Sequence, residues 1–162
     1  MERFTIRAAT PSDAPRLARL IDGLAEFERL SHESRPDAEA LARHLAPDAN
    51  PRCNALLAET PDGREIGFAL FFANYSTFLT SWGVYLEDLF VQPEFRGLGV
   101  GKALFSAVAR TAVDRGAERL DWSVLAWNAG AIGFYEGLGA RAMDDWRTMR
   151  LTGDALRELA AS

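Results

Sequence analysis

The chain has 162 residues, of which 48% are hydrophobic and 25% are charged, a composition typical of one globular domain and too short for two full-size domains. Its formal net charge of −5 disfavours a nucleic acid partner and suits a cationic small molecule better. The single Cys53 excludes an internal disulfide, no apolar run is long enough to span a membrane, and the N-terminus lacks the apolar stretch of a secretory signal. We therefore expect a cytoplasmic protein without a membrane segment.

The N-terminal third predicts one strand and two helices. Apolar and polar residues alternate over Phe4–Arg7, which predicts a short strand. A helix follows from Asp13, with Ser12 as its expected cap. A second, shorter helix is expected from Asp37 and should stop before Pro47. The apolar face of the first helix consists of Leu17, Leu20, Ile21, Leu24 and Phe27.

Three strands and a long helix are predicted next. Asn54–Glu59 and Glu65–Tyr75 flank the turn-forming sequence Pro61–Gly63, so they should form an antiparallel hairpin. Gly83–Val91 is the following strand. A glycine-rich loop then leads into a helix that ends near Gly116.

The C-terminal part predicts a strand over Leu120–Leu125, a helix over Ala129–Leu138 that Gly139 closes, and a last strand over Trp146–Leu151. The resulting order is β-α-α-β-β-β-α-β-α-β. Hairpin strands interleaved with long helices indicate a mixed sheet, so the predicted fold class is α/β (or α+β), with no linker and no internal repeat.

The most specific local feature is the loop Arg96–Lys102, which reads Arg-Gly-Leu-Gly-Val-Gly-Lys and joins a strand to the start of a helix. A helix start leaves backbone N–H groups unpaired and carries partial positive charge, and glycines let a phosphate approach them. Arg96 would add a planar fork of donors and Lys102 a mobile charge. The loop therefore predicts a diphosphate site.

Other phosphate-binding loops fit this sequence less well. A P-loop needs Ser or Thr after its Lys, whereas Ala103 follows Lys102 here. The spacing G-x-G-x-G also differs from the G-x-G-x-x-G of dinucleotide-binding units, which disfavours NAD without excluding it. A glycine turn that binds nothing remains the alternative.

The loop after Leu86–Val91, together with Trp127-Asn128 and Phe134-Tyr135 downstream, resembles the GNAT superfamily of acetyl-CoA-dependent N-acetyltransferases. The strand and the Trp-Asn to Phe-Tyr segment are similar to the spermidine/spermine and thialysine N-acetyltransferase branch. The resemblance covers nearly the whole chain. It implies one GNAT domain over residues 1–162, with a twisted mixed sheet flanked by helices.

The resemblance also implies where acetyl-CoA would lie. The sheet should part after the strand Glu87–Val91 and accept the pantetheine arm there. A homodimer is usual in this branch. No metal is expected, because His32 and His44 have no partner ligands at metal spacing. The residues that would hold acetyl-CoA are Leu89, Phe90, Val91, Arg96, Gly97, Leu98, Gly99, Val100, Gly101, Lys102 and Asn128.

Acetyl transfer to an amine requires removal of a proton, because an alkylamine has a pKa of ~10.4. Glu87 matches the position of the carboxylate that serves this branch as base, directly or through water. Side chains alternate along a strand, so either Glu87 or Asp88 must face the covered side, where an unpaired charge is costly. We favour Glu87 for the function over a surface carboxylate. Tyr135 matches the family tyrosine that acts as general acid toward the sulfur, the alternative being a half-buried structural aromatic.

Candidate acceptor residues are Glu28, which could bring negative charge to an amine site, and Trp146, which matches a family tryptophan near the acceptor. The loop Asn74–Trp82 has no acidic residue, whereas polyamine-acetylating relatives carry one there. We therefore expect the acceptor to be a small cationic amine, either a diamine or polyamine or a lysine-like amino acid. A non-catalytic acyl-CoA-binding or regulatory module and a protein N-acetyltransferase are the alternative functions.

Overall fold

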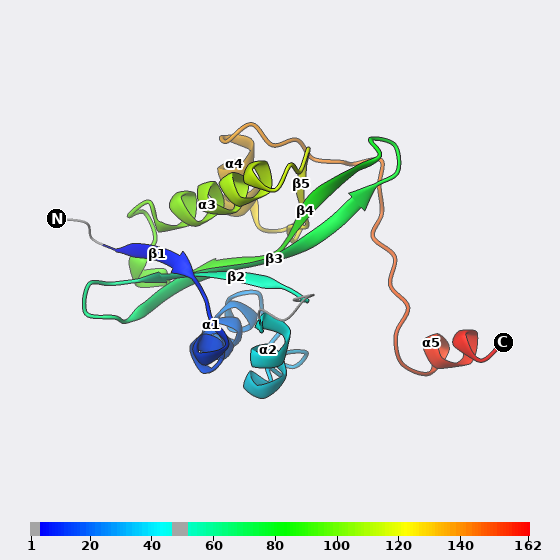
Figure 1. Ribbon diagram of the computed structural model, residues 1–162, viewed down its shortest axis with the longest axis horizontal. Helices are drawn as coiled ribbons and strands as arrows, with labels where there is room; N and C mark the ends of the chain where they lie inside the picture. Colours follow the sequence, from blue (N-terminus) through cyan, green and yellow to red (C-terminus); the bar gives the residue numbers. More distant parts are fainter. Residues whose placement is uncertain (1–3, 47–51) are drawn as a thin grey trace. The chain divides into compact units, whose positions relative to one another are not determined.

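The computed structural model describes residues 4–46 and 52–162 (Figure 1). The chain divides into two compact units, Met1–Ser123 and Val124–Ser162. The first unit holds the sheet and three of the helices, and the second holds two short helices. Pro47, the predicted stop of the second helix, lies outside the described residues.

The first unit is built on a five-stranded mixed sheet with the strand order β1-β2-β3-β4-β5. The first four strands pair antiparallel, and β4 pairs parallel with β5, which confirms the predicted mixed sheet. The strand predicted over Leu120–Leu125 is β5. It is shorter than predicted, because its pairing with β4 ends at Trp122. The strands are β1 Thr5–Ala8, β2 Asn54–Glu59, β3 Glu65–Ser76, β4 Ser81–Val91 and β5 Leu120–Trp122.

Helices cover both faces of this sheet. In Figure 1, α1 and α2 lie on one face and α3 lies on the other. Short 3-10 turns precede α1 and follow β4, at Pro11–Asp13 and Pro93–Phe95. The helices of this unit are α1 Ala14–Phe27, α2 Ala38–Leu45 and α3 Val100–Asp114.

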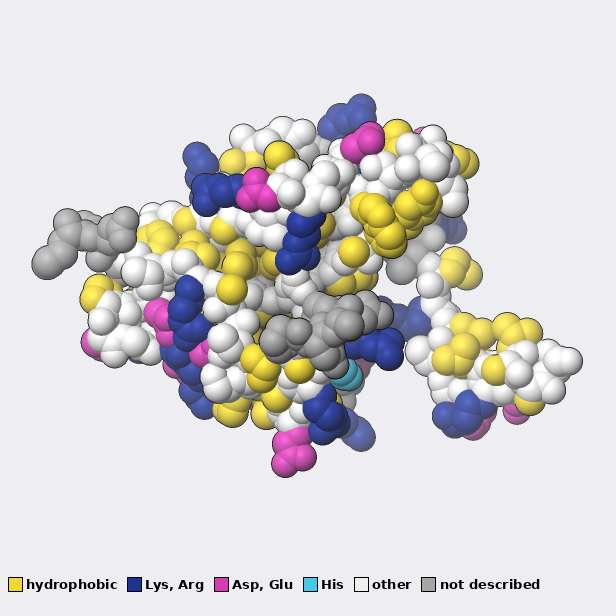
Figure 2. Space-filling view, in the orientation of Figure 1, with side chains coloured by type: hydrophobic (Ala, Val, Ile, Leu, Met, Phe, Trp, Pro, Cys, Tyr) yellow, Lys and Arg dark blue, Asp and Glu magenta, His cyan; other side chains and the backbone are white. Residues whose placement is uncertain are grey.

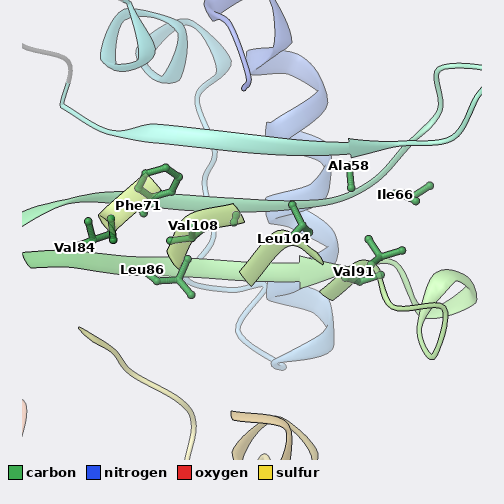
Figure 3. Close-up of a cluster of buried hydrophobic side chains, with 11 residues drawn as sticks. Ala58, Ile66, Phe71, Val84, Leu86, Val91, Leu104 and Val108 are labelled. Atoms are coloured by element: carbon green, nitrogen blue, oxygen red, sulfur yellow. The ribbon is translucent and has the colours of Figure 1, made fainter. Parts of the chain in front are cut away.

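Each face of the sheet has its own hydrophobic cluster. On the α3 face, Leu104 and Val108 pack with Val84, Leu86 and Val91 of β4, as Figure 3 shows. All five side chains are at most 8% exposed. Each such buried aliphatic side chain contributes about 1.5–3 kcal/mol to folding. The α1 face carries the second cluster, made of Leu17, Leu20, Leu24, Leu45, Ala55, Leu57, Phe68 and Phe90.

The start of α1 differs from the prediction that Ser12 caps it. Pro11 opens a 3-10 turn, so Ser12 lies inside that turn and its hydroxyl contacts only the Thr10 hydroxyl, at 2.7 Å, among the described residues. The Asp13 carboxylate instead accepts the Thr10 N–H at 2.8 Å. The predicted start of the second helix is confirmed: Asp37 is its N-cap and accepts N–H groups of the first turn of α2 at 2.9 and 3.1 Å.

The second unit contains α4 Ala129–Glu136 and α5 Gly153–Ala160. The strand predicted over Trp146–Leu151 is wrong: these residues form no strand and are exposed. A strand needs a neighbour to pair its backbone, and residues 124–162 include no other strand. The helix α5 was not predicted. Across the described part of the chain, no helix is long and apolar enough to cross a membrane.

Candidate active site

A β-bulge interrupts β4 at Glu87. On either side of it, Leu70 pairs with Asp88 and Phe71 pairs with Leu86, so two neighbouring residues of β3 match three of β4. Glu87 is the extra residue, and its side chain is exposed. A bulge bends a strand and changes the face on which the following side chains lie.

The bulge places Asp88 on the face of the sheet that α1 covers. Before the bulge Leu86 belongs to the cluster on the α3 face, and after it Val91 does, whereas Phe90 belongs to the cluster on the α1 face. Asp88 is two residues from Phe90 and shares its face. Unbroken alternation would have put Asp88 on the α3 face with Leu86. The prediction that one of the two carboxylates faces a covered side is therefore confirmed, but this carboxylate is Asp88 and not Glu87.

Asp88 lies in an environment that disfavours its ionised form. Burial, and to a lesser extent the charges of Glu87 and Glu28, raise the pKa of Asp88 to about 6. Burial also raises the pKa of Glu28. Within residues 4–46 and 52–162, no Lys or Arg forms an ion pair with any of these three carboxylates. The site thus carries negative charge that the fold does not neutralise.

A C-terminal turn of α1 holds Glu28 in place. The N–H of Leu30 donates to the Ala25 carbonyl at 2.8 Å, and the N–H of Arg29 donates to the Glu26 carbonyl at 3.1 Å. These two bonds form a Schellman motif, in which Glu28 is the C-cap. Arg29 takes the left-handed conformation at φ 61°, where glycine is usual. Because arginine and not glycine stands at this position, the motif could not be predicted from the sequence.

The second edge of β4 opens after the bulge. Pairing with β5 ends at Leu86, so Glu87–Val91 have no strand partner on that edge among the described residues. This agrees with the predicted parting of the sheet. Peptide N–H and C=O groups on such an edge can pair with an extended amide-containing ligand.

The glycine loop has the geometry of an anion site. Gly97 and Gly99 take φ angles of 75° and 86°, and Gly99 is the N-cap of α3. The first helical hydrogen bond of α3 runs from the Ala103 N–H to the Gly99 carbonyl, at 3.0 Å. The N–H groups of Val100, Gly101 and Lys102 therefore lie ahead of the helical ladder, where they can bind a diphosphate. The Val100 side chain is buried, so only its backbone can serve this role.

Arg96 is more constrained than the sequence suggested. Its Nε donates to the Val91 carbonyl at 3.0 Å, and its guanidinium lies over the Phe27 ring, 4.2 Å from the centroid. A second ring, that of Phe90, is 5.8 Å from the same guanidinium. The side chain predicted to be a free fork for phosphate is thus tied to β4 and to the end of α1.

Three predicted site residues belong to the second unit. The Asn128 side chain caps α4 by accepting the Ala131 N–H at 3.1 Å. Tyr135 is buried on α4, with its ring 5.1 Å from that of Phe134. Trp146 is exposed and follows a turn rather than lying in a strand. The roles given to these residues remain predictions.

The described histidine and cysteine side chains indicate neither a metal site nor a reactive thiol. No group of three or more His, Cys, Asp or Glu residues in the described part of the chain could hold a metal ion. Cys53 is half-buried, and burial raises the pKa of its thiol, which makes it a weaker nucleophile.

Comparison with known proteins shows the family and the fold of this chain. The model of the acetyltransferase (GNAT) family matches residues 18–140. The chain is 38% identical to the thialysine N-epsilon-acetyltransferase of Sus scrofa, over 99% of both chains. It is 36% identical to an L-ornithine N5-acetyltransferase of Arabidopsis thaliana, over 95% of this chain and 86% of that protein. An integron cassette protein of V. cholerae has the same fold, with a TM-score of 0.80 over 100% of both chains at 24% identity.

Proposed function

Because the chain belongs to the acetyltransferase (GNAT) family, we propose that it transfers the acetyl group of acetyl-CoA to a primary amine of a small cationic acceptor. One observation carries this proposal: Asp88 is half-buried next to the bulge, near Glu28 and Glu87, and no ion pair with Lys or Arg is described for any of the three. A buried carboxylate is stable in its charged form only with a partner. An acceptor ammonium group would supply that partner.

The named relatives support an amino acid acceptor. Thialysine and L-ornithine, which appear in their names, are amino acids with a primary amine at the end of the side chain. The turn residues 77–80 between β3 and β4 include no acidic residue that could hold a further ammonium group of a polyamine. We therefore place a lysine- or ornithine-like amino acid first and a diamine or polyamine second.

The chain has residues suited to holding acetyl-CoA, which supplies the thioester that the amine attacks. The N–H groups of Val100, Gly101 and Lys102 would bind the diphosphate, and the open edge Glu87–Val91 would pair with the amides of the pantetheine arm. Asn128 is assigned to the same ligand by the family resemblance.

The Glu87 and Asp88 pair would take the proton from the acceptor ammonium. A carboxylate with a pKa of about 6, as for Asp88, is a stronger base than an ordinary aspartate. Exposed Glu87 would bind the incoming ammonium group and would pass the proton taken from that group to solvent. As the N–C bond forms and the C–S bond breaks, the Tyr135 phenol would give its proton to the sulfur.

The proposal includes three further statements. The family match crosses from the first unit into the second, which supports one domain over residues 1–162. A homodimer is proposed from the family resemblance alone. A cytoplasmic location stays a prediction from the sequence.

The test is release of CoA from acetyl-CoA by the purified protein, followed with a thiol reagent. L-ornithine, thialysine, spermidine and a lysine-containing peptide are the acceptors, and a reaction without amine is the blank. We expect release with ornithine or thialysine, and a mass increase of the amine by one acetyl group. Acetyl-CoA binding without release for any amine would contradict the proposal and favour the non-catalytic module.

Tyr135→Phe tests the assignment of the general acid. It should lower kcat by about 10²–10⁴-fold and leave acetyl-CoA affinity nearly unchanged. Tyr75→Phe is the matched control, because Tyr75 is 48% exposed in the β3–β4 hairpin. Equal losses of kcat and of acetyl-CoA affinity in Tyr135→Phe would mean that Tyr135 is structural.

A further inference from the structure

Two hydroxyl groups meet where the pairing of β4 with β5 ends. The hydroxyl oxygens of Tyr85 and Ser123 are 2.8 Å apart, and this hydrogen bond joins β4 to the residue that follows β5. The last pair of the two strands, Leu86 with Trp122, directly precedes Ser123. Ser123 is exposed and Tyr85 is half-buried, so a small ligand can reach the pair.

The hydroxyl pair lies on the same face of the sheet as Asp88. Leu86 belongs to the cluster on the α3 face, so its neighbour Tyr85 lies on the face that α1 covers. Trp122 also packs against the α3-face cluster, so the side chain of Ser123, next to it, lies on the same face as Tyr85. The bulge places Asp88 on this face as well. The proposed base and the hydroxyl pair therefore share one surface.

The distance between Tyr85 and Asp88 follows from their partners on β3. Tyr85 pairs with Phe72 and Asp88 pairs with Leu70. These partners are two residues apart, which places Tyr85 and Asp88 about 7 Å apart along the strand. In an extended ornithine, roughly 6 Å separate the side-chain nitrogen from the carboxyl carbon. An ornithine whose terminal amine lies at Asp88 would therefore bring its carboxylate to the hydroxyl pair.

The pair keeps one hydrogen-bond donor available. Each hydroxyl has one hydrogen, so whichever of the two donates to the other, the second retains a hydrogen for a carboxylate oxygen. Within residues 4–46 and 52–162, neither hydroxyl makes another hydrogen bond. The Tyr85 ring packs against the Phe72 ring, with their centroids 5.4 Å apart, which holds the phenol in place. The pair thus offers a fixed donor to a ligand.

The charge next to the pair is compensated, unlike the charge at Asp88. Asp121 is the partner of Tyr85 on β5, and its carboxylate accepts from Arg119 Nε at 2.8 Å and from Asn74 Nδ2 at 3.2 Å. Asp88 has no ion pair in the described part of the chain. A ligand carboxylate would therefore meet less repulsion beside Tyr85 than beside Asp88.

We propose that Tyr85 and Ser123 form a subsite for the carboxylate of an amino acid acceptor, whose terminal amine lies at Asp88. The free hydroxyl hydrogen of the pair donates to a carboxylate oxygen of the acceptor. This subsite rests on the proposed acetyl transfer, and it makes the two residues determinants of specificity for an amino acid over a diamine.

The test compares L-ornithine with putrescine, which is ornithine without its carboxyl group. Steady-state rates at saturating acetyl-CoA give kcat/KM for each amine, and we expect the unmodified protein to prefer ornithine. In Tyr85→Phe and in Ser123→Ala, the ratio of kcat/KM for ornithine to that for putrescine should fall about tenfold, mainly through the KM for ornithine. The two losses should not multiply in the double variant, because the hydroxyls act as one unit.

Tyr75→Phe and Ser106→Ala are the matched controls. Tyr75 is 48% exposed near the end of β3, and Ser106 is exposed on α3. Neither control should change the ratio. If the Tyr85–Ser123 hydrogen bond only held the two strands together, its loss would lower kcat/KM for both amines alike and leave the ratio unchanged.

The outcomes separate this subsite from the proposed function. An unchanged ratio in Tyr85→Phe and Ser123→Ala would overturn the subsite, while acetylation of both amines would leave the proposed function standing. An unmodified protein that acetylates putrescine as well as ornithine would overturn the subsite too. If no amine supports CoA release, the proposed function fails first and the subsite fails with it.

Discussion

The two ends of α1 carry two groups of carboxylates in opposite electrostatic states. At its start, Asp13, Glu59 and Glu65 are paired with arginines: Arg7 reaches Asp13 at 2.8 Å and Glu59 at 2.7 Å. Figure 2 shows basic and acidic side chains interleaved beside α1. At its end, Glu28 and the carboxylates of β4 have no described ion pair. The ion pairs at the start of α1 join the carboxylates of Asp13, Glu59 and Glu65 to the guanidinium groups of Arg7, Arg16 and Arg19.

The difference appears in the pKa values of two aspartates, the buried Asp13 and the half-buried Asp88. Hydrogen bonds from Arg7 hold the pKa of Asp13 well below its ordinary range, whereas burial raises the pKa of Asp88 to about 6. The helix dipole acts in the same sense, since it favours anions at the start of α1 and cations at its end. The first group stabilises the fold by itself. The second has no described cation partner within the fold, and its proposed partner is the acceptor ammonium group.

The largest expected effect is the loss of acetyl transfer in Asp88→Asn. Asparagine keeps the shape but cannot accept the ammonium proton, so kcat/KM for the amine should fall by about 10²–10⁴-fold. Steady-state rates at saturating acetyl-CoA measure this, and the KM for acetyl-CoA should not change. Full activity in this variant would assign proton removal to another group, with Glu87 as the first candidate.

The second prediction concerns Asp13→Asn, which breaks the paired group. It should lower the free energy of unfolding by about 2 kcal/mol at pH 7, less than for a fully buried pair because Arg7 is partly exposed. A carboxylate with a lowered folded pKa stabilises above its unfolded pKa of 3.8 and loses this contribution as pH falls further. Urea titrations should therefore show a difference at pH 7 that shrinks below pH 4. The kcat/KM for the amine should stay the same, which makes this variant the control for Asp88→Asn.

The third prediction is the opposite effect on stability at Asp88. Because the folded pKa lies above the unfolded one, the folded state binds more protons between about pH 4 and 6, and stability falls as pH rises through this window. Asp88→Asn removes the charge, so it should unfold at higher urea than the unmodified protein at pH 8, by about 1–2 kcal/mol. At pH 4 the two should be alike. A less stable variant at pH 8 would mean that the ionised Asp88 is compensated within the fold.

The smallest predicted effect is at the turn that holds Glu28. Arg29 has φ 61°, which costs a non-glycine residue about 1 kcal/mol. Arg29→Gly should therefore raise the free energy of unfolding by up to about 1 kcal/mol, measured by urea titration, with little change in the KM for the amine. An increased KM would show that the arginine side chain, and not only the backbone turn, serves acceptor binding.

Most regular elements followed from local patterns. The first four strands of the sheet, the helix after the glycine loop and the start of the second helix at Asp37 depend on periodicity and turn chemistry within a few residues. The sequence-based predictions failed where a neighbouring residue changed the local structure, or where a predicted strand had no strand to pair with. Pro11 begins a turn that displaces the cap from Ser12, and the strand predicted over Trp146–Leu151 has no neighbouring strand to pair with in its unit.

The sequence by itself determined that two adjacent carboxylates precede a glycine loop at a helix start, because both features are continuous in the chain. Only the tertiary structure decided which carboxylate faces the covered side of the sheet, since the bulge at Glu87 depends on the register between β4 and β3. It also decided that Glu28 lies close enough to Asp88 to influence its pKa, and that Arg96 contacts Phe27 at the end of α1. Burial and charge compensation are properties of neighbours in space, and local residue patterns do not encode them.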